Sequence, residues 1–230
     1  METIEPGAPP PEIPPALQAE GLWLTDEDGR LYGPLDLVVR PGEKALVIVQ
    51  DQEILRRLMR CCLAFEKPES GRLAWWPGAV LGAGPGDRSG GAFFRQIGYV
   101  DRLSQLLHRW SLLDHLRFFN LYEEDPGEPD DGLEFLGTLG LAAQAAAPTE
   151  NLPESVRRLS LYALALYQRP RLMLLERPFQ FLEQNFNLVW GLIQARIAAR
   201  ELAVVVFDRD PSCYPPGPFH PEVTFALSRL

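Results

Sequence analysis

The stretch from Val47 to Gly71, "VIVQDQEILRRLMRCCLAFEKPESG", reads as a strand, a turn, a helix and the start of a second strand. This is the layout of a phosphate-binding loop, in which glycines let the backbone N–H groups of a helix start wrap an anion. Here the turn contains no glycine, and acidic residues stand at the helix start. Because a carboxylate can accept the free N–H groups itself, we expect Asp51 to cap this helix, with Glu53 in its first turn.

A second helix start shows a related pattern. Asn151 and Glu154 have the N-x-x-E spacing of a capping box, with Pro153 inside the first turn. A polyanion brought to either helix would then meet carboxylates in place of free N–H groups. The sequence therefore predicts two anion-attracting positions that the chain fills with its own side chains.

The other reactive side chains form no recognisable constellation. The cysteines lack the C-x-x-C spacing of metal sites, and we expect small core residues in a reducing compartment. The histidines are scattered, without a metal cluster or a nucleophile–base pair. The glycine-rich stretch 77–91 lacks the strand–loop–helix context of a phosphate cradle, so we predict a loop there. The residues concerned are Cys61, Cys62, Cys213, His108, His115 and His220.

The elements that position these side chains are expected to form one domain, since 230 residues can bury a sufficient core. With 22 basic and 31 acidic residues, the net charge of −9 argues against binding to nucleic acid or to an anionic membrane surface. No apolar run is long enough to cross a bilayer, and the N-terminus lacks a signal-peptide pattern. We therefore expect a cytoplasmic protein without direct membrane insertion. Residues 1–18 are proline-rich and are predicted to be a flexible tail before a single domain at 19–230.

Apolar patterning predicts an α/β fold with a mainly parallel sheet. Continuous apolar runs, typical of strands buried on both faces, occur at "KALVIV" (44–49), "RLMLLE" (171–176) and "LAVVVF" (202–207). Helix and strand patterns alternate through the second half of the chain, which favours parallel pairing. Shorter runs near the N-terminus, "GLWLT" and "LDLVV", indicate an antiparallel addition, with the turn-rich "DEDGRLYGP" between them.

Four short motifs, in this order, resemble the nucleotide-binding subunit of ATP-binding cassette (ABC) transporters. "PGE" at 41–43 and "KPESG" at 67–71 bracket the position of the phosphate-binding loop and its helix. "FRQIGYV" at 94–100 is similar to the strand that leads into the family's Q-loop. "RPRLMLLERPFQFLE" at 169–183 is similar to the Walker B strand and D-loop, and "AVVVFDRDP" at 203–211 to the strand before the switch histidine.

The resemblance covers about residues 20–230. It implies a P-loop-NTPase-like ABC ATPase fold with a mainly parallel core sheet, an N-terminal antiparallel β subdomain and a helical insert at about 102–155.

The resemblance also assigns the family's phosphate-binding positions, in gapless register, to residues that lack the required chemistry. The first glycine of the phosphate-binding loop falls at Val49 and its last glycine at Ile54. The phosphate-binding lysine falls at Leu55, and the magnesium ligand at Arg56. Isoleucine and valine do not readily adopt glycine-only backbone angles, and leucine carries no charge.

The remaining motif positions differ in the same way. The Q-loop glutamine falls at Arg102, the Walker B aspartate at Glu176 and the switch histidine at Arg209. The catalytic glutamate falls at Arg177, which cannot act as a general base. The family's signature falls at 152–156, where "LPESV" lacks both glycines and includes Pro153, Glu154 and Ser155. We therefore expect no catalytic residue, no metal and no bound cofactor.

Several arginines occupy or adjoin these positions. One interpretation is an alternative anion site. The other, which we favour because the chain has a surplus of carboxylates, is a set of ion pairs. The resemblance further suggests that Arg102, Leu106 and Trp110 line a groove for a membrane partner. The arginines are Arg56, Arg57, Arg60, Arg102, Arg157, Arg158, Arg177 and Arg209.

Three functions remain open from the sequence. The favoured one is a non-hydrolytic ABC-type subunit, a structural or regulatory component of a transport complex, with a membrane permease or an ABC ATPase as partner. The second is a divergent ATPase in which Glu176 holds magnesium and arginines hold the phosphates of ATP. The third is a soluble interaction module unrelated to transport.

Overall fold

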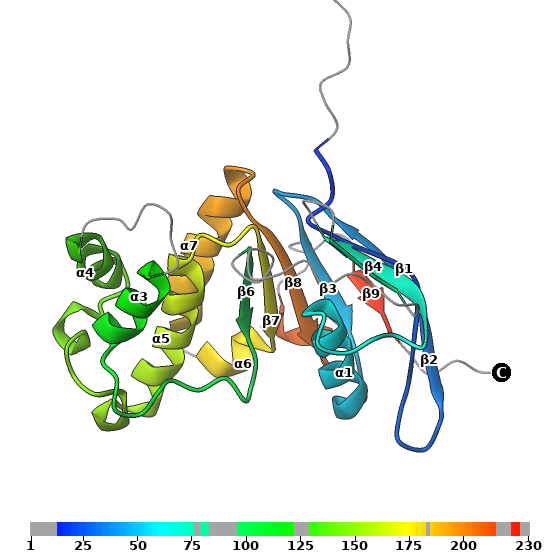
Figure 1. Ribbon diagram of the computed structural model, residues 1–230, viewed down its shortest axis with the longest axis horizontal. Coiled ribbons are helices and arrows are strands. Elements are labelled where there is room, and N and C mark those ends of the chain that lie inside the picture. The colour runs from blue at the N-terminus through cyan, green and yellow to red at the C-terminus, as the bar shows by residue number, and fades with distance from the viewer. Residues whose placement is uncertain are drawn as a thin grey trace, which may run out of the picture.

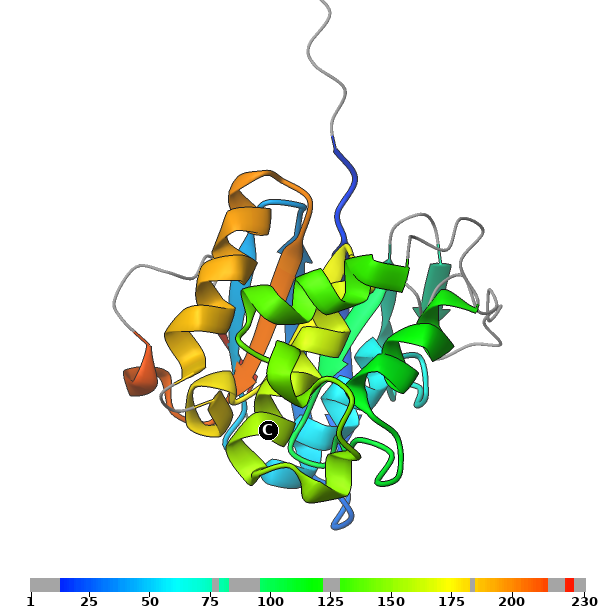
Figure 2. The same ribbon diagram turned by 90° about the vertical axis from the view of Figure 1, so that its left-hand side faces the viewer.

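The computed structural model describes residues 13–75, 79–82, 96–121, 129–182, 185–214 and 222–225. Two sheets stand side by side, with helices between them and on the outer side (Figure 1). Most of the helices gather on the side of the parallel sheet that faces away from the antiparallel sheet, as the turned view also shows (Figure 2). No helix among the described residues combines the length and apolar character needed to cross a membrane.

The antiparallel sheet has the strand order β2-β1-β4-β5. Its strands are β1 (Leu17–Thr25), β2 (Leu31–Val39), β4 (Ser70–Trp75) and β5 (Ala79–Gly82). Burial largely alternates along β1 and β2, as expected when one sheet face covers a core and the other meets solvent.

The second sheet is parallel and has the order β6-β7-β8-β3-β9. Residues of β7 and β8 are buried along the whole strand, because both faces of the sheet are covered. This confirms the strands predicted from continuous apolar runs. The strands are β3 (Lys44–Ile48), β6 (Ile97–Val100), β7 (Leu172–Glu176), β8 (Ala203–Asp208) and β9 (Glu222–Thr224).

The helices divide the core into two clusters of buried side chains. Helix α1 (Gln52–Cys62) packs between the two sheets, and α5 (Glu154–Tyr167) and α7 (Phe186–Ala198) cover the opposite face of the parallel sheet. Successive residues of β7 point to different clusters, so Leu174 belongs to the first and Leu175 to the second.

Shorter helices complete the outer layer. They are α3 (Leu112–Asn120), α4 (Pro129–Thr138), α6 (Pro178–Leu182) and the 3-10 turns η1 (Ala142–Gln144), η2 (Thr149–Asn151) and η4 (Pro211–Cys213).

Some predicted boundaries were wrong. Strand β1 begins at Leu17, so the last two residues assigned to the tail belong to the antiparallel sheet; residues 1–12 lie outside the described part. Strand β2 begins at Leu31, inside the segment predicted as a turn, and β5 lies inside the stretch predicted as a glycine-rich loop. In each case backbone pairing with a neighbouring strand overrides the local turn signal.

Candidate functional site

Four parallel strands end at one edge of the sheet and bring polar residues together there. Asp51 follows β3, Asp101 follows β6, Glu176 ends β7 and Asp208 ends β8. In open α/β sheets this carboxyl edge is where ligands bind. It is therefore the candidate functional site, although the strand ends are far apart in the sequence.

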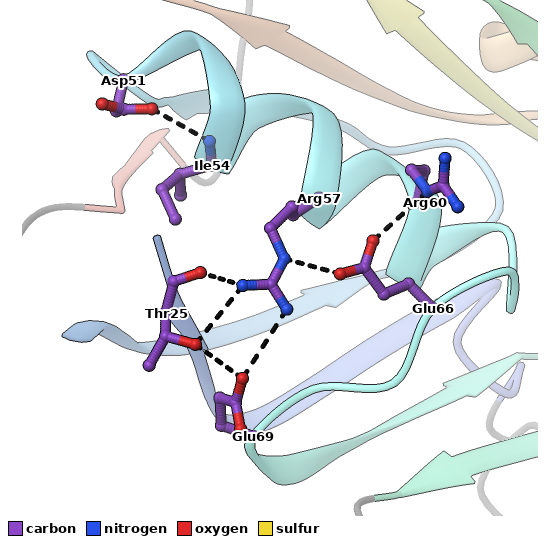
Figure 3. A network of polar contacts seen from close by, with 7 residues as sticks. All are labelled: Thr25, Asp51, Ile54, Arg57, Arg60, Glu66 and Glu69. Atoms are coloured by element: carbon purple, nitrogen blue, oxygen red, sulfur yellow. Dashed lines mark hydrogen bonds and ion pairs between the residues drawn. The ribbon is translucent and has the colours of Figure 1, made fainter. Parts of the chain in front are cut away.

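The start of α1 is capped as the sequence predicts. The Asp51 Oδ1 atom accepts hydrogen bonds from the backbone N–H of Glu53 at 2.8 Å and from that of Ile54 at 3.0 Å. Figure 3 shows the bond to Ile54. Desolvation, followed by repulsion from Glu27 and Asp51, raises the pKa of Glu53. The two N–H groups that would face an anion are therefore bonded to a carboxylate of the chain itself.

The side chains at the phosphate-loop positions belong to the core. Val49, Ile54 and Leu55 are all 0% exposed and pack in the cluster between the two sheets. Arg56 is exposed, on the other side of the helix. Leu55, to which the sequence resemblance assigns the position of the phosphate-binding lysine, thus lies in apolar surroundings.

Glu176 is the centre of the edge and joins two other elements. Its side chain is buried, and its Oε1 atom accepts a hydrogen bond from Gln52 Nε2 at 3.0 Å. Its Oε2 atom accepts the backbone N–H of Arg102, also at 3.0 Å. Both carboxylate oxygens therefore have a partner within the chain, one from α1 and one from the segment after β6.

Asp208 forms a second hub one strand away. It is 0% exposed, and its oxygens accept hydrogen bonds from the Tyr214 hydroxyl at 2.8 Å and from the backbone N–H groups of Arg209 at 2.6 Å and Asp210 at 3.2 Å. The Arg177 Nε atom lies 3.6 Å from Asp208 Oδ1 as an ion pair. Arg177, to which the sequence resemblance assigns the catalytic-glutamate position, has a φ of 45°, in the left-handed region that non-glycine residues rarely adopt.

Further along α1, Arg57 connects the helix to the end of β1 and to the segment before β4 (Figure 3). Its guanidinium bonds to Glu66 at 2.6 Å, approaches Glu69 at 3.6 Å and donates to the backbone carbonyl and hydroxyl of Thr25. Desolvation lowers the pKa of Arg57, but the hydrogen bond to Glu66 and the two acidic neighbours outweigh it, so the net pKa is raised. Arg60 pairs with the same Glu66 at 3.2 Å.

The predicted cap of α5 was wrong. Asn151 lies in η2 and gives no capping hydrogen bond, because the helix begins three residues later at Glu154 and has Pro153 at its N-cap position. Glu154 instead accepts hydrogen bonds from Arg157 at 2.7 Å and Arg158 at 2.7 Å. These two arginines, Arg157 first, lower the pKa of the Glu154 carboxyl.

The arginines mostly take part in ion pairs within the described part of the chain, as the favoured interpretation predicts. Arg57, Arg60, Arg157, Arg158 and Arg177 all pair with carboxylates. Arg102 and Arg209 reach the two hubs through their backbone N–H groups and have exposed side chains.

A groove of about 450 Å³ lies between the segment after β6 and the start of α5. It is lined by Arg102 and Leu106 on one side and by Arg157, Arg158 and Leu161 on the other. Trp110, predicted to belong to this groove, is not among its lining residues. Its ring packs edge-on against His115 and Phe118.

Sequence reasoning missed the residues that close the edge. Gln52, Asp208 and Tyr214 were given no role, yet they supply the side-chain contacts of the two hubs. The polar Gln52 at the first position of α1 was the available signal, but its partner lies 124 residues away. Cys61 and Cys62 are buried in the core as expected, whereas the side chain of Cys213 lies outside the described part.

The comparisons with known proteins agree on one architecture. No family model matches the chain. It is 24% identical over 171 residues to the cytochrome c biogenesis ATP-binding export protein CcmA of Cupriavidus necator, covering 74% of this chain and 73% of that protein. It is 29% identical over 167 residues to the Fe(3+) ions import ATP-binding protein FbpC of Pseudomonas fluorescens, covering 72% of this chain and 46% of that protein.

Solved structures are similar over most of the chain. An ATP-binding cassette in a dimeric post-hydrolysis state, bound to ADP and Pi, superimposes with a TM-score of 0.69 at 15% identity, covering 86% of this chain and 89% of that one. An ATP-binding subunit of an ABC transporter gives a TM-score of 0.68 at 16% identity, covering 86% and 80%.

Proposed function

We propose that this chain, which has the ABC ATPase fold, is a subunit of a membrane transport complex that neither binds nor hydrolyses ATP. Its role would be structural or regulatory, at the cytoplasmic face of the membrane. The relatives' names, an ATP-binding export protein and an ATP-binding import protein, support the transport context. The residues at the carboxyl edge support the loss of nucleotide chemistry.

The filled start of α1 carries this proposal. A triphosphate needs free backbone N–H groups, a cation and room at the helix start. Here the Asp51 carboxylate holds the N–H groups of Glu53 and Ile54, and Leu55 is buried in the core. The residues present do not fit the phosphates of ATP, because an added anion would face the Asp51 carboxylate, and Leu55 offers no positive charge.

The divergent-ATPase alternative depends on Glu176, since a carboxylate there could hold magnesium. Both of its oxygens already accept hydrogen bonds, and the neighbouring Arg177 is engaged with Asp208. Magnesium would have to displace Gln52 and the Arg102 amide, and no neighbouring carboxylate at the catalytic-glutamate position would activate water.

The groove between Arg102 and Arg158 is the surface that we assign to the membrane partner. It combines apolar floor residues, Leu106 and Leu161, with arginines and Glu154 at the rim. A helical or looped segment of a permease that carries apolar and charged residues would fit this lining. A partner ATPase remains an alternative, and the experiment below separates the two.

The first test is a titration of the purified protein with a fluorescent ATP analogue, with and without Mg²⁺, beside a nucleotide-competent ABC ATPase as the positive control. We expect no saturable binding up to millimolar nucleotide. Saturable binding that depends on magnesium, and that Glu176→Gln abolishes, would overturn the proposal and favour the divergent ATPase.

The second test places a photo-crosslinking amino acid at Gln105, which is exposed and lines the groove, and at Glu134, an exposed control on α4. We expect the Gln105 probe, in host cells, to crosslink to an integral membrane protein identified as a permease by mass spectrometry. Crosslinks to a soluble ATPase would assign the groove to that partner. Equal yields at both positions, or none, would contradict the docking assignment.

A further inference from the structure

A second cavity, of about 680 Å³, lies where α3, α4, the end of α5 and α7 come together. It shares no lining residue with the groove and none with the two hubs at the carboxyl edge. Its volume falls in the range of small-molecule sites, roughly 300–1,000 Å³. The proposed function uses no part of it.

Four charged side chains line this cavity, and two of them, of opposite sign, are not paired with each other. Asp131, on α4, and Arg169, just after α5, are both exposed and both contribute to the wall. Within the described part of the chain, neither side chain forms an ion pair or a hydrogen bond. Arg196, in contrast, is occupied, because it donates to the Pro170 carbonyl at 3.0 Å and lies 3.6 Å from Glu201.

The same lining includes aromatic rings and a hydroxyl donor. The rings of Phe135 and Tyr167 lie 5.5 Å apart between centroids, and Phe119 adds a third ring. The Tyr167 hydroxyl oxygen accepts a hydrogen bond from Asn120 Nδ2 at 3.1 Å, and the hydroxyl proton has no acceptor among the described residues.

Gly132 explains how α4 comes close enough to form this wall. A Cβ atom at this position would lie 2.9 Å from Leu116 Cδ1 of α3 and 3.8 Å from the Tyr167 hydroxyl oxygen. The missing side chain therefore lets α4 approach α3 and places the residue before it, Asp131, beside the aromatic wall.

We propose that this cavity binds a small aromatic zwitterion of the α-amino-acid class. The ligand carboxylate bonds to Arg169, its ammonium group to Asp131, and its ring lies against Phe135 and Tyr167. A simple organic anion would leave Asp131 as a repulsive neighbour, and a simple cation would face Arg169. A molecule with both charges satisfies both side chains.

Calorimetric titration of the full chain with L-phenylalanine tests this inference, with ligand-observed NMR as a second readout. The matched controls are 3-phenylpropanoate, which lacks the ammonium group, and 2-phenylethylamine, which lacks the carboxylate. We expect phenylalanine to bind, and each control compound to bind about tenfold more weakly or not at all, since each loses one charge-assisted contact. Absence of phenylalanine binding, or equal binding of either control compound, would overturn the proposal.

Two variants assign the contacts. Arg169→Gln should weaken phenylalanine binding about tenfold and leave the weak affinity for 2-phenylethylamine unchanged. Asp131→Asn should also weaken phenylalanine binding about tenfold and leave the weak affinity for 3-phenylpropanoate unchanged. Arg109→Gln, an exposed arginine outside the cavity lining, is the matched control and should bind phenylalanine normally. Both charges are exposed, so these variants are expected to fold, and circular dichroism verifies this. An equal loss in Arg109→Gln would contradict the site.

Discussion

At the scale of single residues, the chain's own side chains cap the start of α1 and pack it into the core. Leu55 is fully buried, and Asp51 satisfies two N–H groups of the same helix. The Asp51 cap was predictable, because capping depends on neighbours two and three residues away. The comparison of Leu55 with a phosphate-binding lysine, in contrast, depended on the alignment with a family motif.

Replacing these residues should cost folding free energy and restore no chemistry. We expect Leu55→Ala to lower the free energy of unfolding by roughly 2–5 kcal/mol and Asp51→Ala by about 1 kcal/mol. Leu55→Lys should be at least as harmful as Leu55→Ala, because it buries a charge. Urea denaturation measures all three, with the exposed Arg56→Ala as control. A Leu55→Lys variant that is stable and binds ATP would contradict this assignment.

The buried thiols give an independent test of the same cluster. Burial raises the pKa of Cys61 to about 12, and it also raises that of Cys62. The thiolate is the reactive form, so both should be inert in the folded state. In a Cys213→Ser background we expect Ellman's reagent to label no thiol at neutral pH until urea unfolds the protein. Labelling of one thiol in the native state would show that α1 opens locally.

At the scale of elements, Glu176 connects β7 to α1 and to the segment after β6. The strand itself was predictable from its apolar run, and so were β3 and β8. The connection was not, because Gln52 and Arg102 lie 124 and 74 residues from Glu176 in the sequence. The predicted cap of α5 was wrong for a related reason. Asn151 has the spacing of a capping box, but it lies in η2, and the helix begins only at Glu154.

If Glu176 holds the segment after β6 in place without nucleotide, its removal should loosen that segment. Glu176→Gln removes the charge and one of the two acceptor oxygens. The hydrogen bonds to Gln52 and to the Arg102 amide therefore lose their charge-assisted strength, and both can be kept only with the Gln52 amide reversed. We expect faster hydrogen exchange over residues 101–106 and a loss of about 1–3 kcal/mol in unfolding free energy. The exposed Glu150→Gln is the control. Unchanged exchange in the Glu176 variant would mean that other contacts fix the segment.

At the scale of the whole molecule, the charge of the protein combines an excess of acidic residues with local hydrogen bonds and ion pairs of individual carboxylates. The net charge of −9 was readable from composition, but the partners of individual carboxylates were not. Hydrogen bonds from Ser111 lower the pKa of Asp114 below its ordinary value of 3.8, and those from Arg157 and Arg158 lower that of Glu154 below 4.5. At the start of α3, Ser111 and Asp114 form a reciprocal capping box.

These lowered pKa values set the acid limit of stability. A carboxyl with a lower pKa in the folded state contributes its full stabilisation above the unfolded value, and the contribution is lost as the pH falls through the folded pKa. We therefore expect the free energy of unfolding to fall below about pH 4.5, measured by urea denaturation between pH 3 and 7. Asp114→Asn should reduce the slope below pH 4 and leave the slope above pH 5 unchanged. A stability maximum below pH 4 would contradict these pairings.

The parallel sheet also acts as a partition. Neighbours along β7, such as Leu174 and Leu175, belong to separate clusters with no described side chain in common, although one peptide bond joins the two residues. Damage to one compartment is then insulated from the other, and energetic losses on the two sides should simply add. The sheet thus separates two independently packed cores, and sequence changes in one core can accumulate without disturbing the packing of the other.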